Sequence, residues 1–347
     1  MQDAGIVMQK PTIQSGPEAH EESIKKVLKI LKQRAAKPLQ VARKSILEER
    51  VHSKEAREAL RYYAENFLEP TAPAFVSLAC EAVAGNQDKT ALMGAAIALY
   101  VGAVDVHDDI IDHSKRKNGR PTVLGRFGPE VALLTGDALL LKGFELFHRA
   151  TRHLKPSNAD FVTEAVKAAF FEVGDAHAME KSLKNEQRVT VDEYMNLINM
   201  KVACWGAFTE IGAVIGNGTE RQADCLSRYG QIWGLLSTIR NDFVDLYETG
   251  ELKNRMRNEI LPLPILYASE DPHVKKEISI ILLKKKITEG DLKKILDLVL
   301  KSKHVEGLRN RMKSLMDEAE SCLTVLGTSE AKSFLALLVS SMLEDLD

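Results

Sequence analysis

The chain has 347 residues, of which 45% are hydrophobic, so it is long enough to bury the core of one large domain or of two ordinary ones. Its formal net charge of -2, from 47 basic and 49 acidic residues, leaves no electrostatic footprint for nucleic acid or for an anionic membrane surface. This composition argues against a basic nucleic-acid-binding module.

The N-terminal residues 1–20 are polar and irregular, and they lack the basic start and apolar core of a signal peptide. The longest apolar stretch, residues 91–104, is shorter than the roughly 20 residues that a membrane-spanning helix needs. The four cysteines lie far apart and form no CxxC pair, which is typical of buried thiols in a reducing compartment. We therefore expect a cytoplasmic protein with no transmembrane segment.

Apolar residues recur at helical spacing along most of the chain, whereas alternating strand patterns are nearly absent. Amphipathic helices are predicted around residues 24–31 and 278–300. Four further segments are apolar on almost every face, which predicts helices at the centre of a large assembly: residues 91–106, 131–147, 202–215 and 334–343. No linker or repeat divides the chain, so the sequence predicts a single all-α domain over residues 21–347.

Three aspartates follow the first of these apolar segments. Asp108 and Asp112 lie one helical turn apart, and Asp109 flanks them, so their carboxylates should converge. A solvated helix end would explain many acidic triplets. Here the acids extend a helix that is otherwise buried, where an unpaired carboxylate costs several kcal/mol, about the amount that a bound cation offsets. Mg²⁺ prefers such carboxylates together with water and phosphate oxygens, and the spacing predicts a Mg²⁺ site.

The surrounding residues resemble the trans-isoprenyl (polyprenyl) diphosphate synthase superfamily over roughly residues 60–270. The aspartates form the DDxxD motif of a first acidic region, and further motifs follow in the family's order. These are Gly119-Arg120-Pro121-Thr122, Phe127-Gly128, Gly136-Asp137, Thr190 to Tyr194 with Lys201, Tyr229-Gly230, Gly234, Asn241-Asp242 with Asp245, and Leu261-Pro262. This fixed order is far more specific than a lone DDxxD.

The resemblance implies an isoprenoid synthase helical bundle with a central cavity, an allylic prenyl diphosphate as substrate, Mg²⁺ as cofactor and a homodimeric assembly. It assigns Mg²⁺ binding to the first acidic region and, across the cavity, to a second region formed by Asn241, Asp242 and Asp245. It further implies that Lys201 acts in catalysis with the first region, and that Lys117, Lys201 and Thr238 bind substrate. A surface cluster paired with Arg240 is the structural alternative for the second region.

The chain departs from the family where chain-lengthening members bind isopentenyl diphosphate. Their GGKxxRP loop has Glu69 in place of lysine and Ala72 in place of arginine, and Val101 stands at the position of a histidine. The arginine pair before Gly119 is Lys117 followed by Asn118. Loss of three charge-assisted contacts, at about 1.5–3 kcal/mol each, predicts transfer of the prenyl group to an acceptor other than isopentenyl diphosphate.

Three other functions fit the same motifs. A class I terpene cyclase would use a double bond of the substrate itself as the acceptor, although aromatic residues, which hold carbocations, make up only 6% of this chain. An ordinary prenyl diphosphate synthase would need an unusual acceptor site. A non-catalytic subunit of a heteromeric synthase would explain the altered loop but not the intact first acidic region.

Substrate length in this superfamily is set by side chains below the first acidic region. Ala103 and Val104 stand where short-chain synthases usually carry aromatic residues, and Tyr100 lies one turn further from the aspartates. We expect Ala103 to leave the cavity open and Tyr100 to form a deeper floor, unless Tyr100 packs against a neighbouring helix instead. The predicted substrate carries fifteen or more carbons.

Overall fold

A computed structural model describes residues 17–117, 119–185 and 189–343 of the chain. Regular structure in these residues is almost entirely helical, which confirms the predicted all-α fold. A short antiparallel pair of strands, β1 (Arg116–Lys117) and β2 (Arg120–Pro121), forms the exception. Residues 1–16 of the expected irregular segment and Asn118 lie outside the described residues, and the first helix begins at Pro17.

The helices follow one another with short connections. The N-terminal group is α1 (Pro17–Leu47), α2 (Lys54–Asn66), α3 (Thr71–Ala82), η1 (Gln87–Thr90), α4 (Ala91–Ile111), α5 (Val123–Phe127) and α6 (Pro129–Thr151). The central group is α7 (Pro156–Asn185), α8 (Val191–Ile215), α9 (Glu220–Asp245), α10 (Thr249–Asn258) and α11 (Leu263–Ala268). The C-terminal group is α12 (Pro272–Leu282), α13 (Glu289–Leu300), α14 (Lys303–Cys322), η2 (Leu323–Val325) and α15 (Glu330–Ser340).

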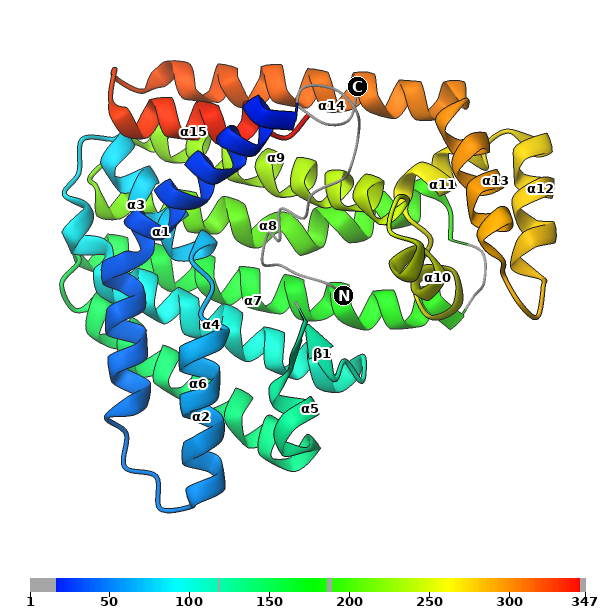
Figure 1. Ribbon diagram of the computed structural model, residues 1–347. Coiled ribbons are helices and arrows are strands. Elements are labelled where there is room, and N and C mark those ends of the chain that lie inside the picture. Colours follow the sequence, from blue (N-terminus) through cyan, green and yellow to red (C-terminus); the bar gives the residue numbers. More distant parts are fainter. Residues whose placement is uncertain (1–16, 118, 186–188, 344–347) are drawn as a thin grey trace.

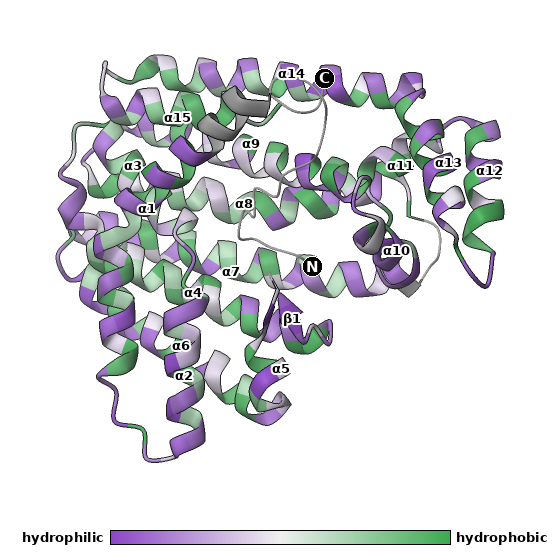
Figure 2. Ribbon diagram, in the orientation of Figure 1, coloured by the Kyte–Doolittle hydropathy of each residue, from purple (hydrophilic) through white to green (hydrophobic). Residues whose placement is uncertain are grey.

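Long helices run side by side through the centre of the molecule (Figure 1). Helix α4 packs along α6, and α8 packs against α3, α7 and α9. Helices α14 and α15 cover α9 and α3, and α1 crosses α3 and α4. Figure 2 shows mixed apolar and polar positions along most helices, whereas α10 is one of the most hydrophilic segments. Helices α4, α7, α8 and α9 all contribute residues to one cavity.

Local hydrogen bonds fix where α8 and α9 begin. The Thr190 side chain accepts a hydrogen bond from the Glu193 backbone N–H, and the Glu193 carboxylate accepts one from the Thr190 backbone N–H in return. Thr219 and Gln222 make the same reciprocal arrangement at the start of α9. Each cap contributes about 1 kcal/mol and sets the position of every later residue on its helix. The caps therefore help to place Lys201 and Asp242.

The core is densest where α3, α8 and α9 meet. The ring centroids of Phe75 and Trp233 lie 4.4 Å apart, and those of Trp205 and Trp233 lie 4.9 Å apart. Gly230 lets α9 approach α8 closely, because a Cβ atom at this position would lie 2.4 Å from the Trp205 carbonyl oxygen. A second cluster of buried side chains joins α2, α4 and α6.

Among the described residues, the stretch Gln87–Ile111 is long and apolar enough to cross a membrane by length and composition. Length alone therefore does not exclude a membrane-spanning helix, because the helix extends beyond the apolar residues 91–104. Burial gives the better criterion, since 72% of the apolar window is covered by the rest of the protein. This burial is what a central core helix requires.

Candidate active site

A deep cavity lies among α4, α7, α8 and α9, with α10 contributing to its wall. On α4 and α7 the lining residues change from apolar to charged or titratable towards the C-terminal end of the helix, and on α9 small uncharged residues precede Asp242 and Asp245. The principal apolar lining residues are Ile97, Val101, Val104, Val166, Phe170, Val173, Ile198 and Phe208. The charged or titratable ones are Asp105, Asp108, His177, Glu180, Lys201, Asp242, Asp245, Glu248, Arg255 and Glu259. The cavity thus has an apolar part and a highly polar part.

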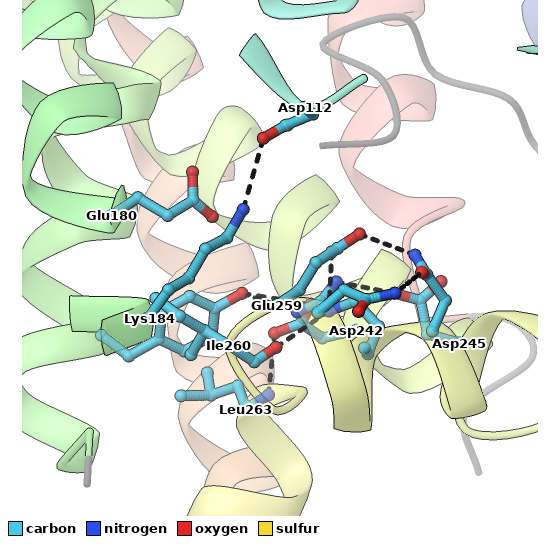
Figure 3. A network of polar contacts seen from close by, with 12 residues as sticks. Asp112, Glu180, Lys184, Asp242, Asp245, Glu259, Ile260 and Leu263 are labelled. Carbon is cyan, nitrogen blue, oxygen red and sulfur yellow. Dashed lines mark hydrogen bonds and ion pairs between the residues drawn. The ribbon is translucent and has the colours of Figure 1, made fainter. Parts of the chain in front are cut away.

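The three aspartates of the first acidic region face different surroundings. Asp108 is buried, lines the cavity and accepts a contact at 3.0 Å from Nδ1 of His177 on α7. Helix α4 ends at Ile111, so Asp112 is its C-cap residue, and its side chain contacts Lys184 at 3.3 Å. Figure 3 shows this contact above the rest of the polar network. The prediction that the three carboxylates converge assumed that the helix continues past Ile111, whereas it ends at that residue.

Asp109 is buried on another side of α4, near Asp105 and Lys117. Burial raises the pKa of Asp109 to about 7, the charges of Asp105 and Asp108 act in the same direction, and Lys117 opposes them. Lys117 itself forms an ion pair with Asp105. Asp105, which lines the cavity, did not emerge from the motif, although it lies one turn before Asp108 and Asp109.

Lys201 on α8 lies at the cavity wall, as the resemblance implied. Its ammonium group contacts the Glu180 carboxylate of α7 at 2.6 Å, and both side chains are largely buried. Although burial favours the neutral form of Glu180, the charge of Lys201 lowers its pKa below the usual value. Glu180 and His177 are one turn apart on α7 and were not predicted from the sequence. Their spacing indicates that they share one face of a helix. Only the fold shows that Glu180 contacts Lys201 and that His177 contacts Asp108.

The second acidic region lies at the C-terminal end of α9. Asn241, Asp242 and Asp245 all line the cavity, and so does Thr238, whose hydroxyl donates to the Gly234 carbonyl oxygen at 3.0 Å. Arg240, the partner in the structural alternative, is buried and does not line the cavity. Arg255 of α10 contacts the region, at 3.0 Å from Asp242 and 2.8 Å from Asp245.

Asp242 and Asp245 differ from freely available metal ligands. Asp242 is 2% exposed, and its Oδ2 accepts the Leu263 backbone N–H at 2.8 Å. Burial raises the pKa of Asp245 to about 7, with Arg255 opposing this rise and Asp242 adding to it. Figure 3 shows Asp242, Asp245 and Glu259 gathered in one network of hydrogen bonds and ion pairs.

The apolar part of the cavity differs in one respect from the prediction. Tyr100 lines it, and its ring also packs against Phe144 and Phe147 of α6 at centroid distances of 5.3 Å and 6.2 Å. Ala103 is 1% exposed and packs in the cluster between α4 and α6, whereas Val104 lines the cavity. Successive helical residues point 100° apart, so the cavity face of α4 passes through Val104 rather than Ala103.

The loop that precedes α3 has an acidic side chain where the family pattern has lysine. The Glu69 carboxylate accepts a hydrogen bond from the Thr71 backbone N–H at 2.8 Å and another from the Thr71 hydroxyl. The pKa of the Tyr63 hydroxyl is raised by burial and by the nearby charges of Asp105, Glu69 and Asp109. Three carboxylates therefore influence this part of the molecule, with Lys117 as a counterion to Asp105.

In the part of the chain that the structure describes, no three acidic, histidine or cysteine side chains stand in an arrangement that could hold a metal ion. The donor chemistry of the first acidic region nevertheless fits Mg²⁺, which prefers carboxylate oxygens. Burial, with the charges of Asp105 and Asp108, raises the pKa of Asp109, and a divalent cation nearby would favour its charged form. The fit is poorer in the second region, where Arg255 already contacts two carboxylates.

Comparisons with known proteins agree on one family. The polyprenyl synthetase family model matches residues 53–299. The chain is 26% identical to geranylgeranyl diphosphate synthase of Methanosarcina mazei, over 60% of this chain and 64% of that protein. It is 32% identical to a short chain isoprenyl diphosphate synthase of Methanocaldococcus jannaschii, over 61% of each chain. The matched stretch thus spans less than two thirds of these curated relatives.

The likeness to solved structures covers more of the fold. Geranylgeranyl pyrophosphate synthetase from Pyrococcus horikoshii superposes with a TM-score of 0.83 and 26% sequence identity. The superposition covers 92% of this chain and 99% of that one. The described helices therefore have the arrangement of an isoprenyl diphosphate synthase.

Proposed function

The chain belongs to the polyprenyl synthetase family, and on this basis we propose that it is a prenyltransferase that cleaves the carbon–oxygen bond of an allylic prenyl diphosphate. The observation that carries the proposal is the change from apolar to charged lining along α4 and α7. An allylic prenyl diphosphate has the same two parts, an apolar chain and an anionic head. The prenyl group of the substrate would lie along Val101 and Phe170, and its diphosphate would lie near Asp108 and Lys201.

The polar residues have complementary roles in this proposal. Asp108, Asp109 and Asp112 would hold Mg²⁺, which would supply positive charge to the diphosphate leaving group. Lys201 provides a further cation for the diphosphate, and Glu180 holds that lysine in place before substrate binds. The apolar wall keeps water away from the allylic carbocation, which would otherwise be hydrolysed.

Chain elongation, with isopentenyl diphosphate as the acceptor, is the first candidate for the complete reaction. The relatives named above are all isoprenyl diphosphate synthases, and their names favour this reaction over the one expected from the altered loop. In elongation, the acceptor double bond supplies the electron pair of the new carbon–carbon bond, and a proton then leaves. Lys117 is the remaining cation among the positions that the family uses for this acceptor.

Transfer to a different acceptor is the second candidate, and one observation favours it. Glu69 replaces a cation at the acceptor loop, and its charge acts on the same tyrosine as the charges of Asp105 and Asp109. Acidic groups at this place repel a diphosphate, whereas a neutral alcohol or an aromatic ring tolerates them. We expect the donor in either case to carry fifteen or more carbons, because Val104 and the other small side chains leave room above Tyr100.

One experiment separates these candidates. The purified full-length chain would be incubated with Mg²⁺, allylic diphosphates of ten, fifteen and twenty carbons, and radiolabelled isopentenyl diphosphate. Label in longer diphosphates supports elongation. Release of diphosphate without incorporation of label supports another acceptor, and a hydrocarbon product indicates a cyclase. Absence of both release and incorporation with every donor would overturn the prenyltransferase proposal in favour of a non-catalytic subunit.

The same assay tests the first acidic region. Substitution Asp108→Ala should lower turnover by about 100-fold or more, because a ligand to the cation at the leaving group is lost. Asp160→Asn, at an exposed position of α7, is the control for removal of one carboxylate and should leave turnover unchanged. Equal turnover of Asp108→Ala and the parent protein, with folding verified by circular dichroism, would contradict the assignment of Asp108.

A further inference from the structure

Arg255 occupies the centre of the second acidic region. Its side chain is 13% exposed and reaches the cavity from α10. Nη1 donates to Asp245 at 2.8 Å, while Nη2 donates to Asp242 and to the Tyr194 hydroxyl oxygen, each at 3.0 Å. A guanidinium group therefore lies among the carboxylates that the family pattern assigns to a metal.

The arginine is also fixed from the side that faces away from these aspartates. Its Nε donates to the Ile260 carbonyl oxygen at 3.0 Å and lies 3.4 Å from the carboxylate of Glu259, the C-cap residue of α10. Leu252, one turn earlier on the same helix, is 1% exposed and anchors α10 in the core. Backbone and core contacts thus place the guanidinium, so its position does not depend on the two aspartates alone.

Three protein groups contact the buried Asp242 carboxylate. Oδ1 accepts from Arg255 and lies 3.4 Å from the Tyr194 hydroxyl, and Oδ2 accepts from the Leu263 backbone N–H. A divalent cation at Asp242 would compete with these donors for the carboxylate oxygens. It would also leave a buried guanidinium close to a second positive charge, which is unfavourable where both are shielded from water.

We propose that Arg255 is the permanent cation of the second acidic region, and that Asp242 and Asp245 hold this guanidinium in place of a divalent metal ion. The four hydrogen bonds described above use four of its five N–H groups, and the remaining N–H, on Nη1, is available to a diphosphate oxygen in the cavity. Metal binding is then confined to the first acidic region. The diphosphate part of this inference rests on the proposed function, but the metal part does not.

Metal binding tests the inference directly. Mn²⁺ would be titrated into the full-length protein in the presence of inorganic diphosphate, and bound metal would be counted by electron paramagnetic resonance. Asp108→Asn should weaken Mn²⁺ binding at least about tenfold, whereas Asp245→Asn should change it less than twofold. A tenfold loss of Mn²⁺ affinity in Asp245→Asn would overturn the proposal. Asp245→Asn is preferable to a change of the more deeply buried Asp242, and a thermal melt verifies its folding.

Variants of the arginine provide the converse test. Arg255→Gln should free the two aspartates and add one Mn²⁺ per chain, and it should weaken metal-free binding of inorganic diphosphate by about tenfold or more. Arg255→Lys retains the charge and should keep the parent metal count. Arg257→Gln, an exposed change on the same helix, is the matched control and should alter neither quantity. An unchanged metal count in a folded Arg255→Gln protein would contradict the inference.

These outcomes are distinguishable from failure of the proposed function. The number of bound metal ions does not depend on prenyl transfer. If the parent protein is inactive but its Arg255→Gln variant gains a metal ion, the role of Arg255 is supported and only the enzymatic proposal is refuted. An active chain that loses metal in Asp245→Asn leaves the enzymatic proposal intact and refutes the role of Arg255.

Discussion

Tyr100 combines two contacts that determine its effect on the cavity. Its ring lines the apolar part of the cavity and also packs on the edge of Phe144. Gly143 of α6 makes room for the ring, because a Cβ atom there would lie 2.8 Å from two of the ring carbons. Both alternatives considered for Tyr100 therefore hold in part, since the ring packs against α6 while one side of it faces the cavity.

Substitutions at the two lining positions of α4 should change the preferred substrate in opposite directions. Tyr100→Ala removes the floor and should shift the preference towards longer donors, since each additional buried CH₂ contributes about 0.8 kcal/mol. Val104→Phe should shift it towards shorter donors by filling the cavity. Turnover with donors of ten to twenty-five carbons would measure the order of preference.

Ala103→Phe is the comparison that separates a cavity effect from general damage. Ala103 packs against α6, so a larger side chain there should destabilise the fold without a specific change in donor order. If Ala103→Phe shifted the preference towards shorter donors and a fully folded Val104→Phe did not, the apolar part of the donor would lie elsewhere.

At the scale of helices, the close contact between α8 and α9 requires glycine at position 230. A Cβ atom at residue 230 would lie 2.4 Å from a backbone oxygen of Trp205, an atom that can move only if the helix moves. Intrinsic helix propensity favours alanine over glycine by about 1 kcal/mol, whereas overpacking costs about 1–3 kcal/mol. Gly230→Ala should therefore lower the free energy of unfolding, although propensity alone predicts a rise.

Gly307 of α14 provides the matched control for this prediction. It is an exposed helical glycine with no atom within 4 Å of the position that a Cβ would occupy. Gly307→Ala should raise stability by up to about 1 kcal/mol. Urea unfolding followed by circular dichroism measures both variants, and equal gains for the two would show that α8 and α9 are less tightly packed than described.

The helices and the first acidic region could be predicted from local spacing, whereas the second acidic region was identified through the family resemblance. The sequence could not place Asp112, since the exact end of α4 decides whether that carboxylate continues the face of Asp108. It also did not identify Arg255, Glu180 or His177 as partners of the aspartates and of Lys201. These contacts link residues on different helices, and their partners follow from the packing of those helices rather than from a repeat in the chain.

Over the whole molecule, exposed apolar side chains are unevenly distributed. Twelve large apolar residues are exposed among those described, and eight of them belong to α6 and α7. These eight are Leu133, Leu134, Leu141, Phe144, Phe161, Phe170, Phe171 and Met179, of which Phe170 lines the cavity, so the other seven are the surface meant below. An isolated exposed leucine needs no explanation, but such a concentration on two neighbouring helices is typical of an interaction surface. Phe144 connects this surface to the cavity, because it also contacts Tyr100.

We expect this surface to form the homodimer that the family resemblance implies, with each copy presenting the same two helices to the other. Analytical ultracentrifugation should then give a mass twice the 38.5 kDa of one chain. Leu141→Glu, at a side chain that is 69% exposed, should dissociate the dimer because it places a charge in an apolar contact. Leu283→Glu is the matched control, since Leu283 is 86% exposed but lies just after α12, and it should leave the mass unchanged. A monomeric parent protein, or dissociation by Leu283→Glu instead of Leu141→Glu, would show that α6 and α7 do not form the interface.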